Sequence, residues 1–311
     1  MLARPAAPEQ IRSSDGCCAG SSPRGCSRHV RKRCRGEFEM PSRKVVLVTG
    51  ASSGVGRATA RLLAEQGHTV FGTSRTPGGG EAVPNLTMLA LDVRSDASVA
   101  ACVNAVSSQA GRLDVLVNNA GYELAGALEE TSLDEAKAQF ETNFFGVVRM
   151  VTAVVPIMRR QQHGHIITIS SLSGLTAIPF MGVYSASKFA VEGYTETLRL
   201  ELKPLHVHVS LIEPGFLKTP MMDKRQVAAA RIEAYEPWRQ RAFNAIRAAE
   251  ETGPGPDLVA ATVLKIITST RPRLRHVAGR QAHVISRLRR FLPEGAFEMG
   301  ARSTFKLDRD G

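Results

Sequence analysis

The chain has few aromatic residues, 5% of its 311 residues with a single Trp, and it has no long apolar run. The longest candidate for such a run, Phe144 to Met158, is interrupted by Gly146, Arg149 and Pro156, whereas a membrane-spanning helix needs about 18 or more apolar residues. Hydrophobic residues nevertheless make up 43% of the chain, which excludes a protein disordered throughout. We expect a soluble globular protein and predict that it is cytoplasmic.

Cysteine is scarce outside the first 39 residues. The leader holds Cys17, Cys18, Cys26 and Cys34, and only Cys102 lies beyond it. This distribution excludes a disulfide-stapled fold. The leader cysteines lack the short paired intervals of a zinc knuckle, so we predict no metal site. The leader also lacks the apolar core of a signal peptide. Its Arg-rich, acid-poor composition is typical of either an organelle transit peptide or, as we prefer, a disordered basic extension over residues 1–39.

Acidic residues are outnumbered, 29 against 40 Lys and Arg, which gives a formal net charge of +11. A basic excess can indicate nucleic acid or an anionic membrane as a partner. Part of the excess lies in the leader, and we predict no nucleic-acid partner. A basic tail, about residues 271–311, mixes arginines with Leu288, Phe291 and Leu292. That mixture is typical of a helix at a membrane surface, but also of a solvated basic face, which is the interpretation that we prefer.

Short apolar segments alternate with helix-period segments from Lys44 onward. Strands are expected near 44–49, 69–73, 86–91, 113–117, 165–170, 207–212 and 275–277, and helices near 55–66, 95–110, 133–161, 183–203, 221–250 and 256–269. Apolar strands separated by amphipathic helices predict an α/β fold, a single Rossmann-type doubly wound parallel sheet with helices on both faces. We expect one domain over residues 40–311, with substrate-lid helices over about 217–250.

A glycine-rich turn follows the first expected strand. The segment from Thr49 to Gly56 places glycines at 50, 54 and 56, where a helix begins. Backbone N–H groups at such a turn can approach a pyrophosphate closely, because no side chains intervene. Glycines that only let a helix pack tightly on a strand would look the same, but the strand–turn–helix context favours dinucleotide binding.

The second expected strand ends in Ser74 and Arg75, where a dinucleotide-binding fold meets the adenosine ribose. An acidic residue there would favour NAD. A guanidinium instead fits a 2′-phosphate through charge-assisted hydrogen bonds. We therefore predict NADP as the cofactor, with NAD possible if Arg75 is only a solvated loop charge.

Tyr184 and Lys188 are four residues apart at the start of a helix, so they lie one above the other on the same face. A nearby ammonium stabilises a phenolate and lowers the pKa of the phenol. Tyr184 can then act as a general acid or base. An ordinary exposed Tyr–Lys pair would have the same spacing.

The strand that ends in Ser170 and Ser171 places hydroxyl groups at the carboxyl edge of the sheet, where ligands bind in open α/β folds. A serine there can donate a hydrogen bond to an oxygen that gains charge. Serine at a strand end is also a common turn or helix-capping residue.

These motifs together resemble the short-chain dehydrogenase/reductase family of the compact, non-extended type. The resemblance runs from about Lys44 to Thr219 and more loosely to Asp308. It implies that Ser171, rather than Ser170, is catalytic together with Tyr184, Lys188 and Asn143. It also implies a set of cofactor-binding residues: Thr49, Gly50, Ser52, Ser53, Gly54, Val55, Gly56, Ser74, Arg75, Asp92, Val93, Asn119, Ala120, Gly121, Tyr184, Lys188, Pro214, Gly215 and Thr219.

The resemblance further implies hydride transfer between a nicotinamide and a carbonyl or alcohol carbon, without a metal. Ser171 would polarise the carbonyl oxygen and Tyr184 would exchange its proton. Lys188 would bind the nicotinamide ribose, and Asn143 would link Lys188 to solvent through water. Family members commonly form homodimers or homotetramers, which we expect here as well.

Apolar side chains in the loops after Ser171 and Thr219 indicate a lipophilic substrate, unless they only pack against the sheet. The expected substrate-lining residues are Leu172, Leu175, Phe180, Met181, Met221 and Met222. In the segment around Tyr184 and in its C-terminal tail, the chain is similar to 17β-hydroxysteroid and retinol dehydrogenase-like members of the family. This similarity implies a steroid- or retinoid-like carbonyl or alcohol as the substrate. A noncatalytic NADP-binding sensor or scaffold is the alternative function.

Overall fold

A seven-stranded parallel sheet forms the centre of the protein in the computed structural model, which describes residues 43–78 and 82–308. The predictions for residues 1–39 lie outside these ranges. The sheet strands are β1 (Val45–Val48), β2 (Thr69–Ser74), β3 (Leu86–Ala90), β4 (Val115–Asn118), β6 (Gly164–Ile169), β7 (Val207–Pro214) and β9 (Arg275–Ala278). Their order is β3-β2-β1-β4-β6-β7-β9, with every neighbouring pair parallel. The predicted doubly wound sheet is confirmed.

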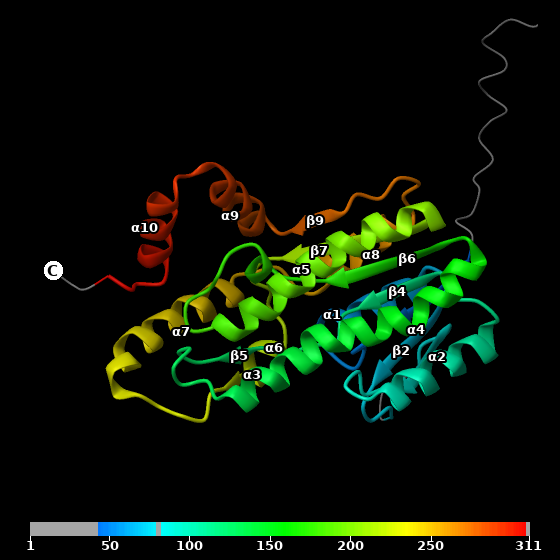
Figure 1. The fold of residues 1–311 in the computed structure, drawn as a ribbon, viewed down its shortest axis with the longest axis horizontal. Coiled ribbons are helices and arrows are strands. Elements are labelled where there is room, and N and C mark those ends of the chain that lie inside the picture. Colours follow the sequence, from blue (N-terminus) through cyan, green and yellow to red (C-terminus); the bar gives the residue numbers. More distant parts are fainter. Residues whose placement is uncertain (1–42, 79–81, 309–311) are drawn as a thin grey trace, which may run out of the picture. The chain divides into compact units, whose positions relative to one another are not determined.

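Helices cover both faces of this sheet (Figure 1). The α-helices of the described ranges are α1 (Gly54–Glu65), α2 (Asp96–Ala110), α3 (Leu133–Phe140), α4 (Gly146–Gln161), α5 (Gly182–Leu202), α6 (Met221–Lys224), α7 (Glu236–Glu251), α8 (Asp257–Ile267), α9 (Arg280–Phe291) and α10 (Glu294–Thr304). The faces of the sheet are covered by α2, α4 and α5 on one side and by α1 and α8 on the other. Successive strand side chains point to opposite faces. Leu47 therefore packs in the core under α2, α4 and α5, while Val46 and Val48 pack in a second core under α1 and α8.

The helix predicted over 133–161 is present as α3 and α4, joined by a π-helical turn over Glu141–Phe145. The combined span Leu133–Gln161 is long and apolar enough to cross a membrane by length and composition alone. One face of α4, including Val147, Met150 and Val154, belongs to the main hydrophobic core. We therefore interpret this span as a core helix of the fold.

The predicted helix over 221–250 is wrong in its middle. Only α6 and α7 are α-helical there, and the chain between them contains the short strand β8 (Gln226–Val227) and one 3-10 turn over Glu233–Tyr235. This strand pairs in parallel with β5 (Leu124–Ala125), outside the central sheet. Pairing with a strand that is distant in the sequence overrides the local helical periodicity. The sequence of this segment alone does not reveal that pairing.

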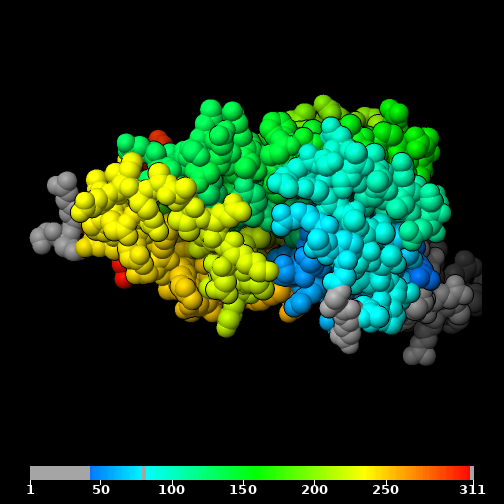
Figure 2. Space-filling model, turned by 90° about the horizontal axis from the view of Figure 1, so that it is seen from below, coloured from blue at the N-terminus to red at the C-terminus, as the bar shows by residue number. Residues whose placement is uncertain are grey.

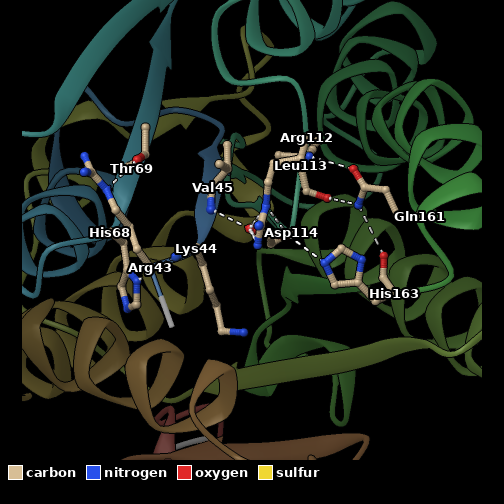
Figure 3. A network of polar contacts seen from close by, with 10 residues as sticks. All are labelled: Arg43, Lys44, Val45, His68, Thr69, Arg112, Leu113, Asp114, Gln161 and His163. Carbon is tan, nitrogen blue, oxygen red and sulfur yellow. Dashed lines mark hydrogen bonds and ion pairs between the residues drawn. The ribbon is translucent and has the colours of Figure 1, made fainter. Parts of the chain in front are cut away.

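The amino ends of the central strands are joined by a polar network around Asp114, whose side chain is 3% exposed (Figure 3). Its carboxylate accepts hydrogen bonds from the Val45 backbone N–H at 2.7 Å and from Arg112 Nη2 at 2.7 Å. His163 Nε2 lies 2.8 Å from the other carboxylate oxygen. Three segments distant in sequence are thus held together at the sheet edge opposite the carboxyl ends of the strands.

Candidate active site

A cavity of about 580 Å³ lies at the carboxyl ends of the central strands. Its wall combines the turn after β1, the ends of β2 and β4, the start of α5 and the segment that follows β7. Figure 2 shows the side on which the yellow-green segment that includes α6 lies next to the blue and cyan N-terminal segments. This is the edge at which open α/β sheets bind ligands, where the strand order reverses between β1 and β4.

The glycine turn has the geometry that close approach of a ligand requires. Gly50 and Gly54 adopt positive φ angles of 68° and 53°, which favour glycine. A Cβ atom at Gly56 would lie 2.2 Å from the Gly50 carbonyl oxygen, so any other residue would force the turn open. The first N–H groups of α1 therefore remain accessible at its N-terminus, where they can bind an anion.

Thr49 supports the turn from behind. Its hydroxyl oxygen accepts hydrogen bonds from the backbone N–H groups of Asn119 at 2.9 Å and Ala120 at 3.0 Å. The Asn119 amide in turn donates to the Thr49 carbonyl oxygen at 2.9 Å. Thr49 is 1% exposed, so this contact joins the turn after β1 to the end of β4 inside the protein. It holds the backbone of the glycine turn in place.

Two arginines gather at the expected adenosine end of the cavity. Arg75 and Arg94 both line it, together with Asp92. Arg94 Nη2 donates to Asp92 Oδ2 at 2.7 Å. This hydrogen bond lowers the pKa of Asp92 to about 2, and the charge of Arg75 contributes in the same direction. Sequence reasoning missed Arg94, although its position two residues after Asp92 was a usable signal.

Tyr184 and Lys188 lie one turn apart on α5, as their spacing predicts. Lys188 Nζ lies 5.8 Å from the centroid of the Tyr184 ring, and the two residues are 9% and 7% exposed, respectively. Burial raises the pKa of Tyr184 above its usual value, the charge of Glu123 adds to this, and a hydrogen bond with the Ser171 side chain opposes it. The expected lowering of the Tyr184 pKa is therefore not borne out, because burial dominates. The phenol is protonated near neutral pH.

The Lys188 ammonium reaches the end of β6. Its Nζ donates to the Ile169 carbonyl oxygen at 2.9 Å. Burial lowers the pKa of Lys188 to about 8, against the opposing effect of the carboxylates of Glu123 and Glu192. The lysine side chain is thus fixed by a backbone contact while its charge remains close to the phenol.

Ser171 and Asn143 occupy different depths of the site. Ser171 lines the cavity, and its hydroxyl oxygen also accepts a hydrogen bond from the Ser173 N–H at 3.0 Å. Asn143, 2% exposed, sits in the π-helical turn behind the wall. Its amide donates to the Tyr122 carbonyl oxygen at 3.0 Å and to Ser187 Oγ at 3.3 Å. Asn143 therefore fixes the backbone after β4 and the base of α5.

Most of the residues predicted for the site come together around this one cavity. Those that line it are Gly50, Ser52, Ser53, Gly54, Val55, Ser74, Arg75, Asp92, Val93, Asn119, Ala120, Gly121, Ser171, Leu172, Met181, Tyr184, Lys188, Pro214, Gly215, Thr219 and Met221. Those that lie outside its wall are Thr49, Gly56, Asn143, Leu175, Phe180 and Met222. The first three of these lie behind the wall or within the turn.

The wall therefore does not include three of the predicted substrate-lining residues, Leu175, Phe180 and Met222. Phe180 packs edge-on against Tyr235 and Phe243, with ring centroids 6.4 Å apart in each case. Its ring is part of the apolar cluster beneath α7. Phe180 therefore packs against the body of the protein and does not line the substrate cavity.

Three charged residues near Tyr184 were not found from the sequence. Glu123 and Glu250 line the cavity, and Arg225 contacts both of them. Glu123 follows the β4 end closely enough to have been noticed. Arg225 and Glu250 lie in segments that carry no local signal, and only the fold brings them to the site.

Comparison with known proteins agrees with this geometry. The family model described as short chain dehydrogenase matches residues 44–229. A 3-ketodihydrosphingosine reductase from Bacteroides thetaiotaomicron is 42% identical, over 85% of this chain and 98% of the relative. Retinol dehydrogenase 8 of Bos taurus is 40% identical, over 81% of this chain and 87% of the relative. A short chain dehydrogenase/reductase of Burkholderia phymatum, solved with NAD, has a TM-score of 0.70 at 28% identity, covering 84% of this chain and 96% of that one.

Proposed function

We propose that this chain, which belongs to the short-chain dehydrogenase family, is an NADPH-dependent reductase of lipophilic carbonyl compounds. It is an oxidoreductase that acts on CH–OH or keto groups and uses a nicotinamide cofactor, as its family does. The observation that carries the proposed direction is the buried, protonated Tyr184 beside Lys188 on the cavity wall. A protonated phenol is the form that can give a proton to a carbonyl oxygen.

The residues present fit a nicotinamide dinucleotide. The turn at Gly50, Gly54 and Gly56 leaves a cradle that a Cβ atom at Gly56 would fill, and the N-terminus of α1 opens into it. Such a cradle suits a pyrophosphate. Gly121, Pro214 and the residues around them on the wall would hold the nicotinamide end.

NADP is supported by the charges at the adenosine end. Arg75 and Arg94 line that end, and the strand β2 finishes in Ser74 rather than in an acidic residue. Two guanidinium groups favour a 2′-phosphate, whereas an acidic residue would repel it. We therefore propose NADP(H) over NAD(H).

The nicotinamide supplies hydride chemistry at a carbonyl carbon when it is bound. The protein acts on the carbonyl oxygen. The Ser171 hydroxyl donates a hydrogen bond to that oxygen, and the Tyr184 O–H transfers its proton to it. Lys188, held by the Ile169 carbonyl, places a positive charge beside Tyr184, which stabilises the phenolate left after proton transfer.

A lipophilic substrate is supported by the apolar part of the wall. Leu172, Ile178, Met181, Phe216, Leu217 and Met221 all line the cavity. Pockets for small molecules are mostly apolar, with a few polar groups that set orientation. The two relatives are named for ketodihydrosphingosine and retinol, both lipophilic compounds.

A homodimer or homotetramer is proposed from exposed apolar side chains on the long helices. Phe145 is 45% exposed and Phe189 47% exposed. Large apolar surface is often covered by a partner subunit. Light scattering of the purified chain measures the oligomeric state, and a monomer at micromolar concentration would refute this part of the proposal.

Contact of the tail with a membrane surface is a separate proposal, and the composition of α9 supports it. Val284, Leu288 and Phe291 are exposed on it at helical spacing, among arginines. Deleting the whole tail would be a poor test, because Phe305 packs with Tyr184 in one apolar cluster. The double variant Leu288→Ser and Phe291→Ser should reduce pelleting with anionic vesicles; unchanged pelleting would refute it.

Replacing Tyr184 with Phe tests the reductase against a noncatalytic NADP-binding protein. Removing the proton donor should lower kcat by about 100- to 10,000-fold while leaving the NADPH dissociation constant within about threefold. The assay follows NADPH consumption with a panel of hydrophobic ketones and aldehydes. Tyr194→Phe, on the same helix but packed against Phe144, is the matched control. Absence of turnover by the wild type on every carbonyl would favour the sensor.

A further inference from the structure

An ionic cluster around Arg275 joins α5 to the strands β7 and β9. Arg275 Nη1 contacts Glu192 of α5 and donates to Glu213 Oε1 of β7 at 2.9 Å. Its Nη2 donates to Glu196 Oε2 at 3.1 Å. Glu192 and Glu213 are buried at 5% and 1% exposed, whereas the Glu196 side chain is 58% exposed. All four residues lie outside the cavity wall, and the mechanism proposed above does not use them.

Glu192 lies one helical turn after Lys188. The two residues are four apart on α5, so their side chains share one face of the helix. The backbone at Gly174 packs against both of them. A Cβ atom there would lie 3.0 Å from Glu192 Cγ, 3.1 Å from the Lys188 carbonyl oxygen and 2.8 Å from Ser170 Oγ. Ser170 directly follows Ile169, whose carbonyl oxygen holds Lys188 Nζ. The Glu192 side chain is therefore enclosed near the end of β6, where the Lys188 ammonium is bound.

The buried Lys188 ammonium depends on negative charges in its surroundings. The hydrogen-bond acceptor of its Nζ is an uncharged carbonyl. Burial lowers the pKa of Lys188 to about 8, and the carboxylates of Glu123 and Glu192 oppose this lowering. Glu123 lines the cavity, so its surroundings change when a ligand binds. Glu192 lies outside the wall, so its charge acts on Lys188 with or without a ligand.

Arg275 does not neutralise Glu192 by itself, because Glu213 shares its Nη1. Burial raises the pKa of Glu192, and the Ser170 hydroxyl and the two neighbouring cations oppose the rise. Burial also raises the pKa of Glu213 to about 7, and the charge of Glu192 adds to that rise. Near neutral pH, Glu213 is therefore the carboxylate that takes up a proton, and Glu192 keeps its negative charge.

We propose that Glu192 is a positioning residue of the active site, whose buried carboxylate keeps the Lys188 side chain charged while Tyr184 gives up its proton. Glu192 acts through Lys188, since it lies outside the cavity wall. Charges interact more strongly inside a protein than in water, so a carboxylate one helical turn away is effective. A charged Lys188 stabilises the Tyr184 phenolate that proton transfer leaves, and a neutral Lys188 does not. This inference rests on the proposed reductase function and adds a residue to its mechanism.

The test is the pH dependence of kcat for carbonyl reduction by Glu192→Gln with NADPH. In this variant Arg275 keeps Glu213 and Glu196 as partners, so its guanidinium is not left unpaired. Removing the charge should move the alkaline limb of the profile, where Lys188 loses its proton, to lower pH by about one unit. A shift of that size lowers kcat about fivefold at pH 8 but by less than about 20% at pH 6. Damage to packing alone would lower kcat by a similar factor at both pH values.

The matched control is Glu196→Gln, one helical turn further along α5. It removes the same charge from a carboxylate that also contacts Arg275 but is 58% exposed and two turns from Lys188. Its alkaline limb should stay within about 0.3 pH unit of wild type, because solvent screens an exposed charge. Glu192→Asp retains a carboxylate and should restore most of the limb that Glu192→Gln loses. An unshifted limb in Glu192→Gln, or an equal shift in Glu196→Gln, would overturn the inference.

A second readout measures the ionisation of Lys188 without turnover. NMR titration of the full chain, with lysine carrying ¹³C at Cε, follows this side chain, and Lys188→Met identifies its signal. The midpoint should fall by about one pH unit in Glu192→Gln. Glu192→Met removes the charge with an apolar side chain and replaces Glu192→Gln if that variant does not fold. The same midpoint with and without the Glu192 charge would overturn the inference.

The two readouts separate this inference from the function on which it rests. Failure of the wild type to reduce any carbonyl would refute the reductase function. The NMR titration would still decide whether Glu192 holds the charge on Lys188.

Discussion

At the residue scale, the site depends on two ionisable groups whose pKa values burial moves in opposite directions. Burial raises the pKa of Tyr184 and lowers that of Lys188 to about 8. Both shifts disfavour charge inside the protein. The Tyr184 phenol therefore keeps its proton near neutral pH, and the neighbouring Lys188 amine readily exchanges a proton with its surroundings. Glu123, which no local pattern in the sequence associates with Tyr184, adds to the rise of the Tyr184 pKa and opposes the lowering of the Lys188 pKa.

Arg75 gives a prediction at this scale. Arg75→Asp removes a guanidinium from the adenosine end and introduces a charge that repels a 2′-phosphate. The ratio of kcat/KM for NADPH to that for NADH should fall by at least about tenfold. Arg160→Asp, on the exposed end of α4, makes the same charge change away from the cavity. An unchanged cofactor ratio in Arg75→Asp would contradict the proposed role.

At the element scale, the carboxyl and amino ends of the strands have different roles. The carboxyl ends carry the cavity, while the amino ends are joined by the Asp114 network seen in Figure 3. Asp114 binds the start of β1 directly, and Arg112 and His163 approach its carboxylate from neighbouring segments. The network therefore maintains the sheet without contacting the site.

Asp114→Ala tests this separation. The substitution leaves the buried Val45 N–H without its acceptor, so the free energy of unfolding should fall by about 2–3 kcal/mol. Michaelis constants measured well below the unfolding temperature should not change. Asp134→Ala, exposed in the first turn of α3, should cost about 1 kcal/mol or less. A loss of stability no greater than in this control would show that the network is dispensable.

At the scale of the whole molecule, the sheet is enclosed by two cores, and titratable groups trapped between its layers make stability depend on pH. His165 on β6 is 7% exposed, and its Nε2 lies 3.0 Å from Ser210 Oγ. Burial, assisted by the charge of His208, lowers the pKa of His165 to about 3. In the opposite direction, burial raises the pKa of Glu213 to about 7.

His165 therefore predicts a specific slope of stability with pH. Between about pH 3 and 6.5 the unfolded chain binds a proton at this imidazole and the folded chain does not, so the free energy of unfolding rises with pH. The contribution is up to about 1.4 kcal/mol per pH unit. Denaturant unfolding of wild type and His165→Gln between pH 4.5 and 6 should differ in slope by about one proton. Parallel slopes would mean that His165 is not buried in its neutral form.

The sequence alone predicted three features: the glycine turn, the Tyr184–Lys188 spacing, and the alternation of apolar strands with amphipathic helices. Each depends on contacts within a few residues: backbone clearance at Gly50, Gly54 and Gly56, one helical turn on α5, and a two-residue or 3.6-residue period. These local features determined the fold class and the family.

Only the tertiary structure decided what surrounds those motifs. The pairing of β5 with β8, the burial that raises the pKa of Tyr184, and the meeting of Glu123, Arg225 and Glu250 all join segments distant in the chain. Their energies come from desolvation and from charges brought together across the fold, which spacing along a chain does not encode. Motifs specify the chemistry because it is local, whereas the electrostatic environment of the reacting groups depends on which charges the fold encloses with them.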